Sequence, residues 1–246
     1  MDTPSLSQPG EAARTSWFDL FLYLASGFGI FLTAGFLLRG PLRSGTLAGS
    51  ALNYTLNILC FGGTVLLMGV RRRKLDLAEI GFWPPRWRWG WLGLALGIVA
   101  VLNPLRIGIA LAAEAALTGS LQALTQSFRM QIFAPGGFTW AGLAVTLGMA
   151  GLLAPAAEEL FFRGAIYSWF RQRAGIWVSV LASSALFALG HADTFAVVIT
   201  SFILGAVNAL VFERTRSLWA SIAIHAVNNC ISVILVYAAL AAGMGR

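Results

Sequence analysis

Seven long apolar runs follow one another along the chain, and they set what it can fold into. They cover residues 17–38, 47–70, 90–117, 138–157, 176–190, 194–212 and 217–241. A helix crosses the hydrocarbon of a bilayer with about 20 mostly apolar residues. We therefore predict an all-α, polytopic integral membrane helical bundle of seven or eight transmembrane helices. The amphipathic segment 158–172 leaves the number open, because its pattern does not decide whether it crosses separately.

Composition agrees with lipid as the solvent. Hydrophobic residues make up 58% of the 246 residues and charged residues 11%, whereas soluble domains average about 25% charged. The net charge of +7 is carried mostly by Lys and Arg in short loops between the apolar runs. Such residues act as topology signals and contacts to anionic lipids, so we expect membrane lipids and no nucleic acid as partners. The sequence does not determine the oligomeric state.

Three regions are predicted along the chain. Residues 1–16 form a polar N-terminal tail, and residues 17–137 form the N-terminal transmembrane helices with an interfacial loop. Basic residues and Trp in the connection 71–89 are typical of an anchor at the membrane–water interface. Residues 138–241 form a helical core that carries the unusual polar residues described below.

The distribution of Lys and Arg predicts the orientation. If 138–172 is a single crossing, eleven basic residues fall on the side of the N-terminus and four on the other side. Basic loops stay in the cytoplasm, so we expect the N-terminus to be cytoplasmic. The expected location is the cell (inner) membrane of a prokaryote.

Two adjacent acids, Glu158 and Glu159, lie deep in apolar sequence, where ionisable side chains are costly and usually functional. Pro155 suits the first turn of a new helix, which would place both acids at a helix N-terminus. Glu159 and Arg163 are four residues apart and can pair on one face. Glu158 points about 100° away, which leaves it for another role.

Both histidines of the chain also lie in or at the ends of apolar runs. Phe187 shares a helical face with His191, and His225 shares one with Asn229. A Glu and a His can take and return protons, while the other His and the Asn amide can donate to a developing oxyanion. Glu158, His191 and His225 could instead bind a divalent metal such as zinc that polarises water. The residue pattern alone leaves both mechanisms open.

The three segments, in this order, resemble the CPBP family of intramembrane peptidases, also called the Abi or type II CAAX prenyl endopeptidase family. The family pattern is E-E-x-x-x-R, then F-x-x-x-H, then H-x-x-x-N. The matching residues are Glu158, Glu159, Arg163, Phe187, His191, His225 and Asn229. The resemblance covers roughly residues 138–241.

The resemblance implies a membrane endopeptidase whose cavity opens to the membrane and the cytosolic side. Glu158 would activate water with help from His191, and His225 with Asn229 would form the oxyanion site. Glu159, Arg163 and Phe187 would support them. Eukaryotic members of the family cleave prenylated CAAX proteins, whereas bacterial members often act on other substrates, some of them in bacteriocin self-immunity. The expected substrate is therefore a membrane-bound, lipidated or unlipidated, protein or peptide.

Two other functions would use the same cluster. One is a non-catalytic immunity or scaffold protein, and the other is a proton-coupled transporter with Glu158 as its proton site. An intact Glu-His-His-Asn set favours the peptidase. A transporter more often shows two related halves, which the sequence does not show.

Overall fold

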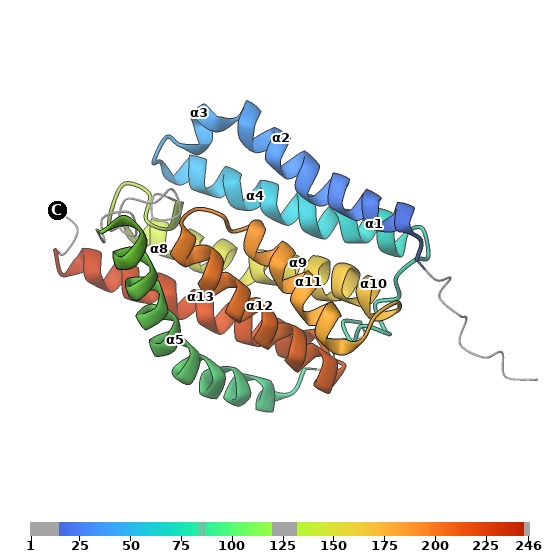
Figure 1. Ribbon diagram of the computed structural model, residues 1–246. Helices are drawn as coiled ribbons and strands as arrows, with labels where there is room; N and C mark the ends of the chain where they lie inside the picture. The colour runs from blue at the N-terminus through green and yellow to red at the C-terminus, as the bar shows by residue number, and fades with distance from the viewer. Residues whose placement is uncertain (1–14, 84, 86, 120–131, 244–246) are drawn as a thin grey trace, which may run out of the picture.

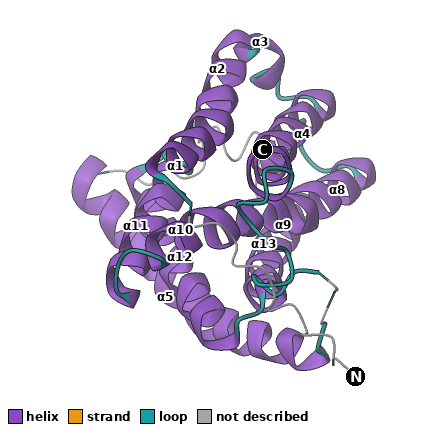
Figure 2. Ribbon diagram, turned by 90° about the vertical axis from the view of Figure 1, so that its right-hand side faces the viewer, coloured by secondary structure: helices purple, strands orange, loops and turns teal. Residues whose placement is uncertain are grey.

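The structure, a computed structural model, describes residues 15–83, 85, 87–119 and 132–243 as a bundle of helices (Figure 1). Most of the predicted polar tail, residues 1–14, lies outside the described residues. Helical segments shown in Figure 1 are α1 (Trp17–Leu24), α2 (Ile30–Leu37), α3 (Arg39–Leu42), α4 (Leu47–Thr64), α5 (Trp89–Thr118), α8 (Trp140–Thr146), α9 (Ala154–Glu159), α10 (Ser168–Arg171), α11 (Ile176–Leu189), α12 (Phe195–Thr215) and α13 (Leu218–Ala241). Figure 2 shows helix and loop but no strand in the described residues.

Six helices within the described residues are long and apolar enough to cross a membrane, so the chain is an integral membrane protein. They are Trp17–Leu37, Leu47–Val70, Trp89–Leu117, Trp140–Arg171, Phe195–Thr215 and Leu218–Ala241. The prediction of seven or eight transmembrane helices is confirmed in part, because the described residues contain these six helices and one shorter apolar helix. The apolar run 176–190 forms α11, which at 14 residues spans about 21 Å, short of the roughly 30 Å hydrocarbon core.

Residues 140–171 form one continuous helix, so the segment 158–172 does not cross separately. Three of its stretches are regular α-helix, and the connecting stretches Leu147–Leu153 and Leu160–Tyr167 are π-helical. The prediction that a new helix starts at Pro155 was also wrong, because Ala154 keeps helical dihedrals (φ −63°, ψ −47°). A π-helical turn precedes the proline. Its wider spacing tolerates the missing hydrogen bond, because proline has no backbone N–H to donate. Glu158 and Glu159 therefore lie in mid-helix, without the dipole of a helix N-terminus.

The C-terminal helices enclose the polar residues. α11 packs along α12, and α13 packs on α5 and on the helix 140–171. The first helix, Trp17–Leu37, packs mainly on α4, and these two lie together at the top of Figure 1. Gly205 on α12 permits the close approach of α11, because a Cβ there would lie 3.2 Å from the Cβ of Ser184.

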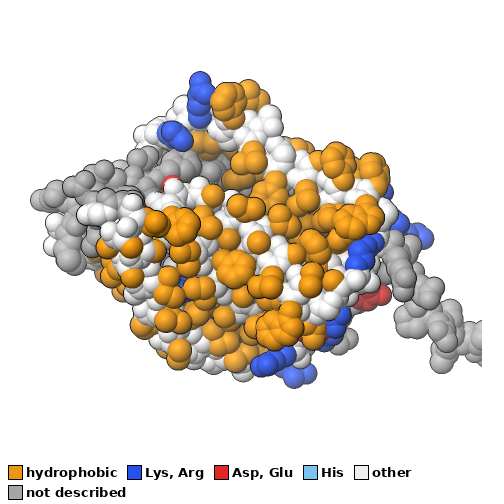
Figure 3. Space-filling model, viewed as in Figure 1, with side chains coloured by type: hydrophobic (Ala, Val, Ile, Leu, Met, Phe, Trp, Pro, Cys, Tyr) orange, Lys and Arg blue, Asp and Glu red, His pale blue; other side chains and the backbone are white. Residues whose placement is uncertain are grey.

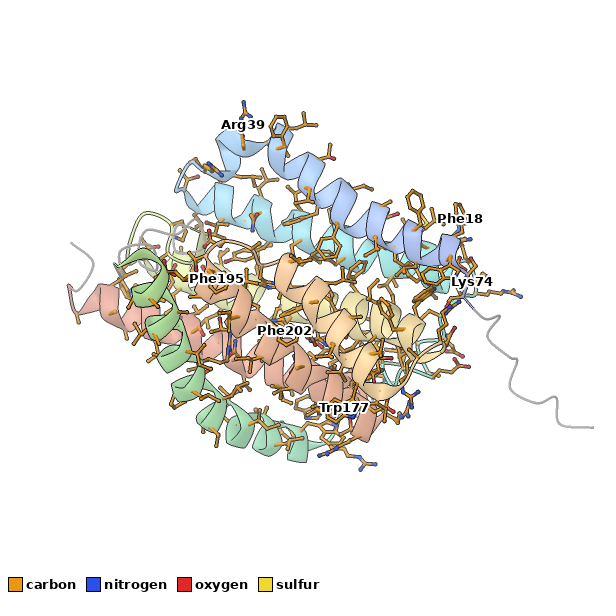
Figure 4. The ribbon with its side chains drawn as sticks, viewed as in Figure 1. Phe18, Arg39, Lys74, Trp177, Phe195 and Phe202 are labelled. Atoms are coloured by element: carbon orange, nitrogen blue, oxygen red, sulfur yellow. The ribbon has the colours of Figure 1, made fainter. Side chains whose placement is uncertain are left out.

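The two ends of the bundle differ in charge. At the end that we call the basic end, the connections are 71–88, 172–175 and 216–217; at the opposite end, they are 38–46, 132–139 and 190–194. Figure 4 shows Phe18, Lys74 and Trp177 toward the basic end, and Arg39 and Phe195 toward the opposite end. Hydrophobic side chains cover the middle of the face shown in Figure 3, whereas Lys and Arg lie toward its edges. This banding fits a molecule surrounded by lipid between two aqueous layers.

Candidate active site

The predicted site residues come together in the interior of the bundle, although they lie on separate helices. The helix 140–171 carries Glu158, Glu159 and Arg163; α11 carries Phe187 and leads into His191; α13 carries His225 and Asn229. Glu158 and Glu159 are 6% and 0% exposed, and His225 is 2% exposed. The two acids point to different neighbours, as their angular separation predicts.

Glu159 is a point where three helices meet. Its Oε1 accepts hydrogen bonds from Arg163 Nη1 at 3.0 Å, Asn208 Nδ2 at 3.0 Å and His225 Nδ1 at 2.9 Å. Asn208 lies on α12 and His225 on α13, whereas Arg163 lies one turn further along the same helix as Glu159. Arg163 also donates from Nη2 to the carbonyl oxygen of Gly205 at 2.8 Å. The predicted Glu159–Arg163 pair is thus part of a larger buried network that holds α12 and α13 in place.

Glu158 faces both histidines with one oxygen. Its Oε2 lies 3.6 Å from His191 Nε2 and 3.7 Å from His225 Nε2. Its Oε1 accepts a hydrogen bond from Asn57 Nδ2 of α4 at 2.9 Å. The distances to the two imidazoles exceed those of direct hydrogen bonds, so a water to one side of these atoms can bridge the carboxylate and an imidazole.

The other ring nitrogen of each histidine is already engaged. His191 Nδ1 lies 2.8 Å from the carbonyl oxygen of Phe187, and His225 Nδ1 lies 2.9 Å from Glu159. Both partners are acceptors, so each Nδ1 donates and each Nε2 is turned toward Glu158. The two rings are thus oriented independently onto the same carboxylate.

Phe187 supports three of these groups at once. Its ring centroid lies 4.4 Å from that of His191 and 5.5 Å from that of His225. The guanidinium carbon of Arg163 lies 4.8 Å from the same centroid. The aromatic residue predicted beside His191 therefore packs against both imidazoles and the buried cation.

The short α11 explains how His191 reaches the site. The helix ends at Leu189, and His191 lies in the turn that follows, with its backbone N–H donating to the carbonyl of Ala188 at 3.0 Å. A full-length helix would carry this residue to the membrane surface, whereas the truncated helix leaves it beside Glu158, with 14% of its side chain exposed.

Asn229 lies on the same helix as His225 but makes different contacts. Its Nδ2 donates to the carbonyl oxygen of Ala150 at 3.0 Å, in a π-helical stretch, and its Oδ1 accepts from Asn228 Nδ2 at 3.0 Å. Asn228 in turn accepts from Arg106 Nη1 of α5. These bonds fix the amide of Asn229 while leaving its second N–H for another acceptor.

A cavity of about 860 Å³ reaches Glu158, His191 and Asn229. Its polar wall also includes Asn53 and Asn57 of α4. Much of the remaining wall is apolar, and the residues that form it include Leu24, Phe28, Phe31, Leu32, Phe61, Phe162, Leu186 and Leu189. The volume lies in the range of sites that bind small ligands. His225 lies behind Glu158 rather than in the wall.

Two residues that contact the acids were not predicted from the sequence. Asn57 and Asn208 each donate to one of the two glutamates. Both are amides within apolar runs, a pattern that is costly in lipid unless the amide finds a partner. An amide side chain in an apolar run indicates that a polar partner lies nearby, but the sequence does not identify that partner.

The acids and histidines that the structure describes were compared with the ligand sets of metal sites. Among the residues that the structure describes, no group of three or more His, Cys, Asp or Glu side chains is placed to hold a metal ion. The mechanism proposed below uses Glu158 and the two histidines directly.

The site defines a class of membrane protein, with buried carboxylates and imidazoles around a cavity between helices. Residues 139–231 match the family model described as type II CAAX prenyl endopeptidase Rce1-like. This segment of the chain is therefore an Rce1-like domain of the type II CAAX prenyl endopeptidase (CPBP/Abi) family, which is a family of hydrolases. Neither the curated proteins nor the solved structures include a match to the chain.

Proposed function

We propose that the protein is an intramembrane endopeptidase that hydrolyses peptide bonds with a water molecule activated by Glu158. The observation that carries this proposal is the position of Glu158 Oε2, which faces the Nε2 atoms of His191 and His225 at 3.6 and 3.7 Å beside the cavity. A water about 2.8 Å from both Glu158 Oε2 and His191 Nε2 fits the 3.6 Å between them when it lies to one side of the line that joins them. Domain membership supports a hydrolase acting on protein substrates.

The reaction follows from these positions. Glu158 takes a proton from the water, and the resulting hydroxide attacks the carbonyl carbon of the scissile peptide bond. A C–O bond forms, and the carbonyl oxygen becomes an oxyanion. The proton held by Glu158 then passes to the amide nitrogen, and the C–N bond breaks to give a carboxylic acid and an amine. His191 orients the water and assists the proton transfer.

Asn229 and His225 are the proposed oxyanion donors. The second N–H of the Asn229 amide is available at the cavity wall, since the first is bonded to Ala150. The ring of His225 lies between the carboxylates of Glu158 and Glu159, and its Nε2 is the atom that we propose as the donor. Fixed donors of this kind stabilise the transition state because they need no reorganisation when charge develops.

The cavity wall supports a substrate that comes from the membrane. Phe28, Phe31 and Leu32 of the first helix and Leu186 and Leu189 of α11 line it on either side. These side chains suit an apolar or lipidated peptide segment, whose transfer from lipid to such a wall costs little. The proposed substrate is therefore a membrane-anchored peptide or protein.

The decisive experiment compares wild type with Glu158→Gln. Each purified protein is reconstituted in liposomes with membrane-anchored peptides, and products are identified by mass spectrometry. Wild type should release defined fragments, and Glu158→Gln should lower the rate by about 10²–10⁴-fold, as for loss of a general base. Retained helix content and a similar unfolding temperature would show that the variant folds. Cleavage by Glu158→Gln at the wild-type rate would refute the mechanism.

A further inference from the structure

The cavity opens at one end of the bundle. Its exposed lining residues are Leu32, Arg43, Leu189, Gly190, Ala192 and Asp193. Five of them lie in or beside the connections 38–46 and 190–194, which belong to the end opposite the basic end, and Leu32 lies on α2 less than two turns before the first of these connections. None of the described residues in the connections 71–88, 172–175 and 216–217 lines the cavity. Access from water is therefore from the opposite end.

The basic end is closed by packed side chains. The largest buried cluster of the described residues contains Tyr23, Phe161, Phe162, Tyr167 and Trp169. Phe161 and Phe162 contact Phe61 with ring centroids 4.9 and 5.6 Å apart. Phe61 and Phe162 also line the cavity. Protein interiors packed in this way do not admit a peptide.

The charges of the two ends are unequal. Among described residues, the basic end carries Arg71, Arg72, Arg73, Lys74, Arg88, Arg171, Arg173, Arg214 and Arg216, whereas the opposite end carries Arg39 and Arg43. This assignment of basic residues to the two ends requires that residues 140–171 cross only once. They form one continuous helix whose two ends lie at different ends of the bundle. Short loops rich in Lys and Arg remain in the cytoplasm.

Two expectations from the sequence are thus incompatible in this fold. A cytoplasmic N-terminus follows from the basic residues, and a cavity open to the cytosol follows from the family resemblance. Trp17 begins the first helix at the basic end, whereas the cavity opens at the opposite end. If the basic end is cytoplasmic, the cavity faces the other side of the membrane.

We propose that substrates reach Glu158 from the extracytoplasmic side of the membrane. This rests on the proposed peptidase function and narrows its substrate class to membrane-anchored peptides or proteins whose scissile bond is exposed to, or lies just beneath, the extracytoplasmic surface. A lipid-modified C-terminus held on the cytoplasmic surface would meet the closed aromatic end instead. The apolar walls formed by Phe31 and Leu189 then receive the membrane-embedded part of the substrate.

Cysteine labelling tests the orientation without relying on activity. Ala192→Cys places a thiol at the cavity mouth, and Gly175→Cys places one at the basic end, where an added side chain meets nothing within 4 Å. Right-side-out spheroplasts of a bacterial host are treated with a membrane-impermeant maleimide, and the parent chain, with Cys60 and Cys230, measures background. Ala192→Cys should be labelled at least tenfold more than Gly175→Cys. Inside-out vesicles should reverse the ratio, and the reverse pattern in spheroplasts would overturn the proposal.

A second experiment tests the side of cleavage. Proteoliposomes that carry Gly175→Cys, away from the cavity, are sorted by labelling of that thiol into the two orientations, and an anchored peptide with its cleavable segment outside the vesicle is added. Cleavage should be at least tenfold faster where the thiol of Gly175→Cys is protected inside the vesicle. Faster cleavage in the opposite orientation would overturn the inference but leave the peptidase function intact. A different result would be no cleavage in either orientation, together with equal activity of wild type and Glu158→Gln in detergent. That result would refute the peptidase function and, with it, this substrate assignment.

Discussion

His225 Nδ1 lies 2.9 Å from Glu159 Oε1, while His225 Nε2 faces Glu158 at 3.7 Å. The second glutamate of the pair therefore orients the imidazole that faces the first. This relationship gives the two adjacent acids different tasks, although both are carboxylates in the same turn of helix. It also means that their variants should fail in different ways.

Glu159→Gln should destabilise the protein. It leaves the fully buried Arg163 without a carboxylate partner, and it leaves Asn208 and His225 with a neutral amide oxygen in place of the charged acceptor. Breaking a buried ion pair in this way costs about 3–5 kcal/mol. Thermal unfolding in detergent should show a clear drop in midpoint, whereas Glu158→Gln should shift it by only a few degrees. Equal midpoints for the two variants would contradict the assigned roles.

The variants of the two histidines should differ in their cleavage rates and unfolding midpoints. His191→Ala removes a ring in a turn that is partly exposed, so cleavage should fall by about 10²-fold with little loss of stability. His225→Ala removes a buried ring and the donor to Glu159, so both cleavage and stability should fall. The check is the rate of peptide cleavage beside the unfolding midpoint of each variant. A His191→Ala protein that unfolds as readily as His225→Ala would show that its role is structural.

Asn57→Ala should slow cleavage because the Glu158 carboxylate is no longer held in position. Its Nδ2 holds Glu158 Oε1 at 2.9 Å, and without that bond the carboxylate can rotate away from the histidines. We expect kcat to fall about tenfold, the scale of one hydrogen bond to a charged group, with KM within about twofold of wild type. Asn53→Ala is the matched control, because Asn53 lines the same cavity one turn away. A comparable loss in the control would indicate a general effect on the cavity.

Exhaustive chelation should leave cleavage unchanged. The described acids and histidines are not arranged as a metal centre, and the mechanism uses Glu158 to activate water directly. Activity of the purified enzyme is measured before and after treatment with a strong chelator, followed by metal analysis of the protein. Loss of activity that zinc restores would require a metal mechanism.

Gly27→Ala should destabilise the contact between the first helix and the core. A Cβ at Gly27 would lie 2.6 Å from Phe161 Cε2, a ring that is itself fully buried. Overpacking of this kind costs about 1–3 kcal/mol. Gly29→Ala serves as the control, since a Cβ at Gly29 meets nothing within 4 Å. The unfolding midpoints of these two variants, two residues apart on one helix, should differ by several degrees.

Hydropathy predicted the membrane bundle and the position of most spans, because the need for apolar side chains acts on every residue of a crossing. It placed the run 176–190 within one residue of α11 but counted this run as a crossing, although 14 residues are too few for the hydrocarbon core. Pro155 was also misread. A proline favours a helix start in isolation, but a preceding π turn lets the helix 140–171 continue through it.

The spacing of the motifs predicted which site residues share a helical face, including the Glu159–Arg163 pair. It did not identify Asn57 and Asn208, because contacts between distant helices are not encoded in local spacing. Nor did it show that His225 bonds to Glu159 rather than standing with Asn229 at the cavity wall. Those relations depend on how four helices pack.

The 14-residue α11 has a consequence for the lipid around the protein. Its apolar length is about 9 Å less than the hydrocarbon thickness, so hydrophobic mismatch should draw the adjacent bilayer thinner at that flank. A thinned bilayer brings headgroups and their hydration water closer to His191. Water is the second reactant of hydrolysis, and the hydrocarbon region would otherwise lack it. Acyl-chain length thereby becomes a variable of the reaction, with thicker bilayers imposing a greater deformation beside the site.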